Sequence, residues 1–154
     1  MIKFRRIGQN EIDILETLTL RKADANELKA ATGLNNPLAA LKSCVLHSTE
    51  WTEIGYDDET GVVHCLFGLS SAGGIGIPWM VASPLLRQHK KLFIRYSKKV
   101  ITEMFSQFDI LCNYVDSRNT LHIHWLKHMG FVFEGEDIKL SGVPFKYFYL
   151  RKEN

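Results

Sequence analysis

The stretch from Val81 to Leu92 combines a proline with a run of basic side chains, a composition that suits binding of an anion. An apolar segment precedes it and a long amphipathic segment follows, so the pattern predicts a strand that leads directly into a helix. The first amides of a helix have no partner within it, and the helix dipole favours negative charge there. The sequence therefore predicts a phosphate-binding turn. Its candidate residues are Val81, Arg87, Gln88, His89, Lys90, Lys91 and Leu92.

The same basic run has a second interpretation. Without an anion, cations in the first turn oppose the helix dipole by roughly 0.3–1 kcal/mol each. Most basic runs are nevertheless solvated faces, and these side chains could be no more than that. The local sequence leaves both interpretations open.

A second candidate segment covers residues 115–131. Asn119 comes just after a predicted strand, and ligands of α/β sheets bind beyond the carboxyl ends of strands. We therefore expect Asn119 to face a cleft and add it to the candidate binding residues. Asp116 or Ser117 is expected to cap the helix that follows.

Other residues of reactive type give weaker patterns. His124 and His128 are four residues apart near His122, but the glutamate of His-Glu-x-x-His and a third ligand are missing, so we expect no metal site. The Gly73–Gly76 run precedes a strand, whereas a dinucleotide fingerprint follows one and opens a helix. His64 and Cys65 are expected to pack inside a strand. The three cysteines (Cys44, Cys65, Cys112) are widely spaced in apolar contexts, as reduced, buried thiols are.

The periodicity of the chain predicts an α/β (α+β) fold. Strands are expected at residues 2–7, 51–56, 62–69, 75–82, 110–115, 131–140 and 144–151, with helices capped by Asn10, at 23–32, from Pro37, at 85–108 and at 117–129. A mixed sheet covered by helices follows from this order. Pro78 lies within a predicted strand, which must therefore be an edge there or carry a bulge.

Composition sets further limits. With 154 residues, 45% hydrophobic and 23% charged, the chain suits one globular domain over residues 1–154. No apolar run approaches the ~20 residues of a membrane span, and the N-terminus lacks the pattern of a signal peptide. We therefore expect a cytoplasmic protein without membrane insertion. A nucleic-acid role for the basic helix face formed by Lys90, Lys91, Arg95, Lys98 and Lys99 is a further option, but a net charge of +2 gives no argument for it and we do not expect a nucleic-acid partner.

Together the two segments resemble the coenzyme-binding core of the GNAT acetyltransferases. The family's Val-x-Pro-x-x-Arg-x-x-Gly-x-Gly/Ala turn is matched by Pro84 and Arg87, and its Asn-x-x-Ala-x-x-Leu-Tyr-x-x-x-Gly-Phe pattern is matched in spacing from Asn119 to Phe131. The resemblance implies a mixed, mostly antiparallel sheet of about seven strands, with helices on both faces and a V-shaped cleft between the central strands. It also implies acetyl-CoA as cofactor, held at the pyrophosphate by residues 87–92, with amides near Val81 on the thioester carbonyl and Asn119 at the pantetheine arm.

The sequence departs from the family at four positions. Lys90 and Leu92 replace the small residues of the turn, His122 replaces the alanine, and Leu126 replaces the tyrosine that often protonates the leaving thiolate. A Cβ at Lys90 stands where the diphosphate approaches the backbone.

A resemblance over nearly the whole chain is to the small GNAT-like proteins of tailed bacteriophages, including an internal virion protein of short-tailed phages required for head-core assembly. It rests on the segments 28–33, 77–79, 115–119, 125–131 and 142–145. It implies a phage origin, phage structural or assembly proteins as partners, and a place in the host cytoplasm or the virion interior.

Two functions follow from these resemblances. The first is a degenerate acetyltransferase that serves virion assembly through protein binding, which the four departures favour. The alternative is an active acetyl-CoA-dependent N-acetyltransferase that acts on an amine of a protein or small molecule. For the alternative, the catalytic residues stay unassigned. Glu53 and Asp57 are the acidic residues nearest the expected region.

Overall fold

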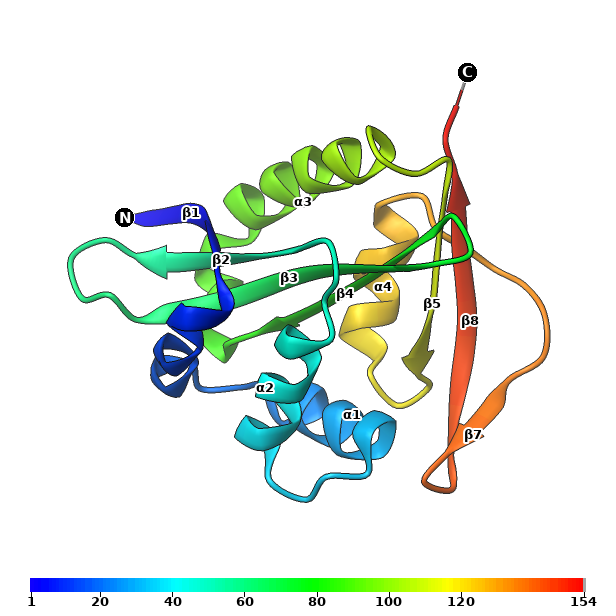
Figure 1. Cartoon of the computed structure of the whole chain (residues 1–154), viewed down its shortest axis with the longest axis horizontal. Helices are drawn as coiled ribbons and strands as arrows, with labels where there is room; N and C mark the ends of the chain where they lie inside the picture. The colour runs from blue at the N-terminus through cyan, green and yellow to red at the C-terminus, as the bar shows by residue number, and fades with distance from the viewer. Residues whose placement is uncertain (154) are drawn as a thin grey trace.

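A computed structural model describes residues 1–153 of the chain. Strands alternate with α-helices (Figure 1) and with two 3-10 helices, which we call η1 and η2. In chain order the elements are β1 (Ile2–Ile7), η1 (Gln9–Thr17), α1 (Lys22–Thr32), α2 (Pro37–Leu46), β2 (Trp51–Asp57), β3 (Val63–Ala72), β4 (Ile75–Ala82), η2 (Pro84–His89), α3 (Lys90–Phe105), β5 (Ile110–Asp116), α4 (Thr120–His128), β6 (Val132–Phe133), β7 (Ile138–Leu140) and β8 (Val143–Arg151).

All eight strands join one sheet in the order β1-β2-β3-β4-β5-β8-β6, with β7 also paired to β8. Every pair is antiparallel except β4 and β5, which confirms the mixed, mostly antiparallel sheet predicted from the sequence. The count is eight and not seven because the segment 131–140 is broken in two. Gly135 has a φ of +94°, a conformation that side chains other than glycine's rarely adopt, and it separates β6 from β7.

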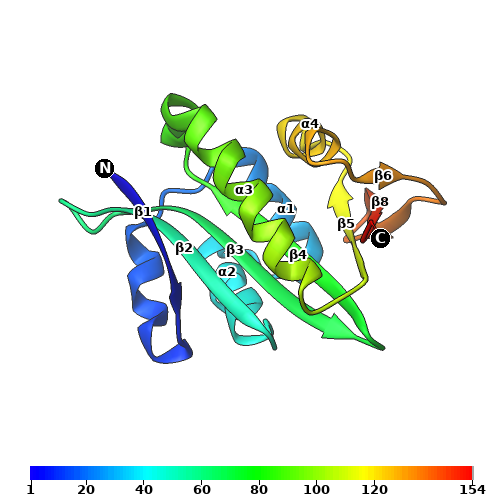
Figure 2. The same cartoon turned by 90° about the horizontal axis from the view of Figure 1, so that it is seen from above.

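Helices cover both faces of the sheet, as expected (Figures 1 and 2). On one face, α3 and α4 pack over a core that includes Phe67, Phe93 and Met104. On the other face, η1, α1 and α2 pack over a second core that includes Leu15, Leu41 and Ile54. The sheet therefore separates two apolar layers. A side chain on one face can contact groups on the other face only where two neighbouring strands part.

The strands part between β4 and β5. Their pairing consists of Gly76 opposite Leu111, near the start of both strands, and the strands diverge towards Ala82 and Asp116. Pro78 lies on the diverging edge, and its carbonyl accepts a hydrogen bond from Asn113 Nδ2 at 2.8 Å. Because β4 has no strand partner on that side beyond Gly76, the missing proline N–H costs no ladder bond.

Of the two arrangements predicted at Pro78, an edge or a bulge, the structure has the edge. The register between β3 and β4 runs without a shift from Cys65 opposite Ala82 to Ala72 opposite Ile75, so Pro78 is accommodated at an edge. The register shift in this part of the sheet lies instead between β2 and β3, at Gly55 and Tyr56.

Three helix boundaries also differ from the prediction. The first helix is a 3-10 helix preceded by Gly8, so Asn10 lies inside it and does not cap it. The long helix expected from Leu85 begins at Lys90, because Pro84–His89 forms the separate turn η2. The last helix begins at Thr120. Asp116 holds the preceding turn through the amide of Arg118, at 2.9 Å, and caps no helix.

Candidate functional site

The gap between β4 and β5 is crossed by side chains from α1. Asp24 Oδ2 accepts a hydrogen bond from the amide of Ala82 at 2.9 Å, and the carbonyl of Ala82 accepts one from the amide of Arg21, also at 2.9 Å. The start of α1 thus takes up both main-chain groups that the end of β4 directs into the gap. Because neighbouring residues of a strand direct their main-chain groups to opposite sides, those of Val81 point the other way, towards β3.

Asn119 lies on the far side of the gap, where the sequence predicted it, but it is buried, with 1% of its surface exposed. Its Nδ2 donates to Asp24 Oδ1 at 2.8 Å, and its Oδ1 accepts from Arg21 Nη2 at 3.3 Å. Arg21 Nη1 also donates to Asp24 Oδ1, at 3.0 Å. The amide of Asn119 is therefore held from both ends by α1 and is turned towards the protein.

Glu27 completes the bridge one turn further along α1. Its Oε1 accepts from the amide of Asp116, at 3.1 Å, and from Asn119 Nδ2, at 3.3 Å. Its Oε2 lies 3.6 Å from Nδ1 of the buried His122, an ion-pair distance when the imidazole is protonated. Burial is the largest single effect and lowers the pKa of His122, but the Glu27 and Asp24 carboxylates together outweigh it, so the pKa lies above its usual value. We call Arg21, Asp24, Glu27, Asn119 and His122 the gap network.

The space between α3 and α4 is also filled. Trp125 Nε1 donates to Ser97 Oγ at 3.1 Å, and the Trp125 ring stacks on Phe93 with centroids 5.9 Å apart. What remains between these helices and β4 is a cavity of about 20 Å³, room for roughly one water molecule. An elongated ligand cannot pass between α3 and α4 into the gap while Trp125 keeps this position.

The turn before α3 keeps its cations, and the main-chain groups at its start offer no free amide. Pro84 has no N–H, the amide of Leu85 donates to Ser83 Oγ, and that of Leu86 donates to the carbonyl of Ser83, both at 3.1 Å. The predicted phosphate-binding side chains from Arg87 to Lys91 are all exposed, and Leu92 is half-buried. At residues 84–86 an anion therefore finds no free main-chain donor, whereas further along it meets the exposed side-chain charges and the start of α3, which no side chain caps.

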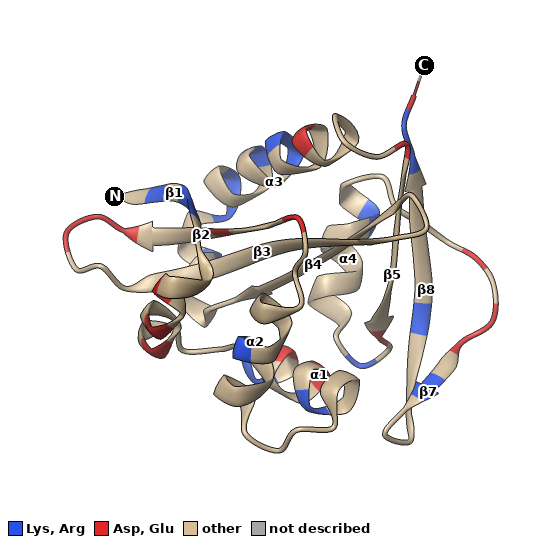
Figure 3. Cartoon of the chain, viewed as in Figure 1, with Lys and Arg blue, Asp and Glu red and all other residues tan. Residues whose placement is uncertain are grey.

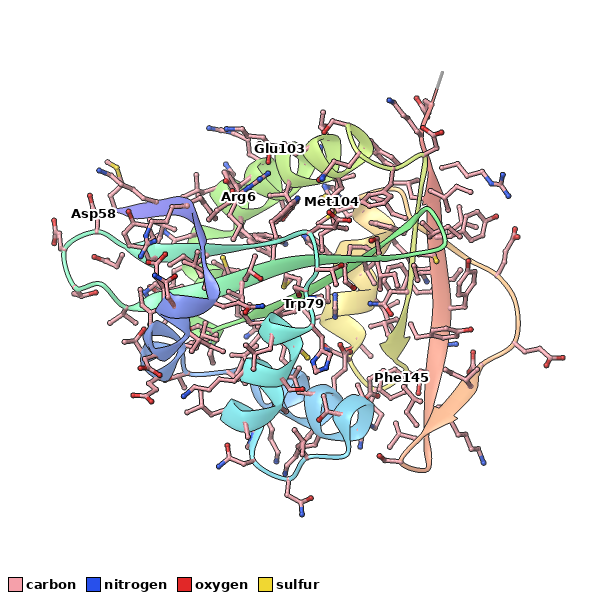
Figure 4. All side chains as sticks on the ribbon, in the orientation of Figure 1. Arg6, Asp58, Trp79, Glu103, Met104 and Phe145 are labelled. Atoms are coloured by element: carbon pink, nitrogen blue, oxygen red, sulfur yellow. The ribbon has the colours of Figure 1, made fainter. Side chains whose placement is uncertain are left out.

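A hollow remains on the opposite face of the gap, between α1, α2 and the parted strands. Its volume is about 270 Å³. Aromatic side chains in its lining include Trp79, Tyr114 and Phe145, and polar ones include Glu27 and Asn113. Trp79 Nε1 donates to Ser48 Oγ at 2.7 Å, so the indole is fixed in the wall of the hollow (Figure 4).

The two acids considered for catalysis lie outside the gap. Asp57 accepts the amides of Glu59 and Thr60 in the β2–β3 turn, which lowers its pKa. Glu53 is buried on β2 beneath α3, where burial raises its pKa. Neither reaches the gap network, which lies two strands from β2.

Other residues of reactive type are structural or exposed. His124 and His128 are exposed, whereas His122 is buried, so the three do not converge. Within residues 1–153 no group of three or more potential metal ligands occurs, and no helix has the length and apolarity to cross a membrane. Burial raises the pKa of Cys44 to about 11 and that of Cys65 to about 12.

The structure thus separates the predicted binding residues into two groups. Asn119 and Ala82, the residue after Val81, both donate hydrogen bonds to the Asp24 carboxylate in the gap. The basic side chains between Arg87 and Lys91 lie at the surface. The sequence interpretation missed Arg21, Asp24 and Glu27. A signal was present for Asp24, because it precedes the buried Leu28 by four positions and so shares its side of α1. Glu27 precedes the exposed Ala31 by four positions, so helical spacing gave no such signal for it.

Solved structures with the same architecture are acetyltransferases. An aminoglycoside N(6')acetyltransferase from Legionella pneumophila superposes with a TM-score of 0.71 at 16% identity, covering 97% of this chain and 91% of that one. A GCN5-related N-acetyltransferase from Kribbella flavida gives 0.66 at 13%, covering 98% of each. The chain has the GNAT fold. A third GNAT-fold structure, aminoglycoside acetyltransferase AAC(6')-Ib in complex with coenzyme A, gives 0.67 at 13% and covers 99% of this chain and 95% of that one.

The GNAT fold predicted from the two sequence segments is therefore confirmed. A family model described as bacteriophage T7, probable scaffold protein Gp13, matches residues 68–137, somewhat less than half of the chain. This match runs from β3 to the loop before β7 and supports the phage resemblance. No curated protein sequence matches the chain.

Coenzyme A does not fit the gap between β4 and β5, because side chains of this protein already fill it. An arm lying between β4 and β5 needs the amides that Asp24 and Glu27 already occupy. His122, which stands where the family has alanine, and Trp125 take up the space beside α4. The carboxylates would also repel a polyanionic ligand at short range.

Proposed function

We propose that this protein is a phage GNAT-fold protein that has lost acetyl transfer and serves virion assembly by binding other phage proteins. The observation that carries the proposal is the pair of α1 carboxylates on the amides of Ala82 and Asp116, the main-chain donors that a coenzyme arm in the gap would use. A ligand would have to break the gap network and leave both carboxylates without their amide partners, which is costly for buried, hydrogen-bonded charges.

The hollow on the α1–α2 face supports a role in protein binding. It is the larger of the two cavities described above, and its aromatic lining is of the kind that protein interfaces favour. In this proposal a phage structural or assembly protein inserts a side chain there, in the host cytoplasm or inside the virion.

The alternative function is an acetyl-CoA-dependent N-acetyltransferase acting on an amine. What favours it is the fold together with the exposed cations Arg87, Lys90 and Lys91 at the start of α3. Those cations could attract the phosphates of a coenzyme even though the gap is filled.

Calorimetric titration of the full chain with acetyl-CoA and with coenzyme A separates the two functions. We expect no heat of binding and no rise in melting temperature at ligand concentrations up to about 1 mM, which bounds the affinity near −4 kcal/mol. A micromolar Kd that is lost in the variant with Arg87→Ala and Lys90→Glu would overturn the proposal.

Two substitutions by tryptophan, one inside the hollow and one outside it, test the proposed binding of another phage protein. Ala31 is exposed and lines the hollow, whereas Ala72 is exposed at the end of β3, outside the hollow. Ala31→Trp should reduce the yield of particles when it replaces the wild-type protein in infected cells, and Ala72→Trp should not. Equal yields from the two variants would remove the hollow from the proposal. Mass spectrometry of purified particles shows whether the protein is packaged, and its absence would limit it to an assembly factor.

A further inference from the structure

The exposed face of α3 carries a row of cations without neighbouring acids. Between Glu59 and Glu103 the sequence has six lysines and arginines and no aspartate or glutamate. All six lie on η2 and α3, and we call them the basic ridge: Arg87, Lys90, Lys91, Arg95, Lys98 and Lys99. Figure 3 shows the blue segments of this ridge along α3, while red segments gather on η1 and the β2–β3 turn.

Helical spacing directs most of the basic ridge outward. Lys91, Arg95 and Lys98 follow one another at four and three residues, opposite the buried side formed by Phe93, Ser97 and Val100. At 1.5 Å per residue, the positions from Lys90 to Lys99 extend over about 14 Å of helix. The cations therefore form a line on the surface.

The basic ridge is not neutralised by the rest of the protein. Among residues 1–153, no carboxylate lies within ion-pair distance of any of its six side chains. The one acid of α3, Glu103, pairs with Arg6 at 3.5 Å, at the far end of the helix (Figure 4). Lys99 does lie over the Tyr96 ring, at 5.7 Å, but this contact leaves its charge in place.

We propose that the basic ridge is a binding site for the phosphate backbone of nucleic acid, without base specificity. Duplex DNA carries one negative charge per about 1.7 Å of its axis, so a 14 Å ridge faces more phosphates than it has cations. An acidic protein is a poorer match, because protein interfaces are depleted in lysine and need an apolar centre. Four of the six side chains are lysines, and the outward face of α3 has no large exposed apolar residue.

The near-neutral charge of the whole chain does not reveal this site. A net charge of +2 with six uncompensated cations on η2 and α3 means that the rest of the protein is net negative. The low net charge, which gave no argument for a nucleic-acid partner, therefore says little about this one face. The basic ridge shares Arg87, Lys90 and Lys91 with the predicted coenzyme-phosphate turn, whereas Arg95, Lys98 and Lys99 lie further along α3, outside that turn.

Fluorescence anisotropy with a labelled 20-base-pair DNA of arbitrary sequence tests the inference on the full chain. Non-specific sites of this kind have a Kd of about 10⁻⁴–10⁻⁶ M at physiological salt, so the titration starts at 50 mM NaCl. With about four to five phosphate contacts, raising the salt to 200 mM should weaken binding roughly 10²- to 10³-fold. A second, unrelated DNA sequence should bind equally well.

Charge-reversal variants test whether the basic ridge is the surface that binds DNA. The triple variant Lys91→Glu, Arg95→Glu, Lys98→Glu should weaken binding at 50 mM NaCl on the order of 100-fold. The matched control reverses Lys22, Lys29 and Lys139, which are exposed, lie on other elements and have no ion pair within residues 1–153. The control should lose much less affinity, and both variants should keep the wild-type circular dichroism.

Three results would overturn the inference. One is an absence of DNA binding by the wild type at 50 mM NaCl. Another is an equal loss in the two triple variants, which would reduce the effect to net charge. The third is displacement of the DNA by polyglutamate as efficiently as by unlabelled DNA at the same charge concentration, which would assign the ridge to an acidic protein.

Discussion

Replacing Asp24 by alanine tests the gap network most directly. Asp24 is 2% exposed and accepts three hydrogen bonds, from the amide of Ala82, from Asn119 Nδ2 and from Arg21 Nη1. The substitution leaves a main-chain amide, a side-chain amide and a partly buried guanidinium without their common acceptor. The two sides of the gap also lose the group that joins them.

The expected loss of stability follows from these contacts. A hydrogen bond to a charged group contributes about 1.5–3 kcal/mol, and removing one partner of a buried ion pair costs about 3–5 kcal/mol. Because these terms describe overlapping contacts, we expect a decrease in the free energy of unfolding of about 3–5 kcal/mol in total. For a domain of this size that corresponds to a decrease in Tm of roughly 10–15 °C.

Urea denaturation followed by circular dichroism measures the loss, with Asp13→Ala as the matched control. The Asp13 side chain is 89% exposed and lies 3.6 Å from Lys42, so its removal should change the free energy by less than about 1 kcal/mol. Asp24→Asn should fall between the two, since an asparagine has a single acceptor oxygen for the three donors. A decrease below about 1 kcal/mol in Asp24→Ala would refute the view that these bonds hold the gap closed.

Three further substitutions and one chemical probe test other parts of the structure. Trp125→Ala removes the contacts with Ser97 and Phe93 and should cost about 2–4 kcal/mol, measured by denaturation, while making the α3–α4 cavity accessible to xenon under pressure. His122→Asn should lower the Tm more at about pH 5.5 than at about pH 8.5. The raised pKa of His122 gives stability that is complete below the usual value of 6.5 and is lost as the pH rises through the raised pKa, so an equal effect at both pH values would contradict the pairing with Glu27. Gly68→Ala places a methyl group against the Trp79 indole and should cost about 1–3 kcal/mol, with a change in tryptophan fluorescence. Of the three thiols, Cys112 should react first with Ellman's reagent in the folded protein, because burial raises the pKa of the other two.

Much of the architecture could be predicted because apolar periodicity reports burial. The strands 2–7 and 75–82 were predicted at the bounds that the structure has. Helix starts were less predictable, because Pro84 permits both an α-helix and a 3-10 turn at its first position. Hydrogen bonds that the amides of Leu85 and Leu86 donate to Ser83 favour the turn.

The candidate site was predicted in part. Asn119 was placed correctly beside the gap, since strand–helix junctions are readable from sequence. The hydrogen-bond partners of Asn119 were not predicted, because Arg21 and Asp24 lie 98 and 95 residues away in the chain. Charged residues of a helix are normally interpreted as solvated, and only tertiary structure shows that this pair faces a parted sheet.

The parting of β4 from β5 creates two inner strand edges, and such edges are the usual places where a foreign strand can add to a sheet. In this protein the two inner edges have few free main-chain groups with which a foreign strand could pair. Pro78 has no N–H, Asn113 covers its carbonyl and also accepts the amide of Tyr114, and the amides of Ala82 and Asp116 are held by α1. The same side chains that fill the gap therefore leave the parted edges few free main-chain groups with which to pair with another copy of the chain.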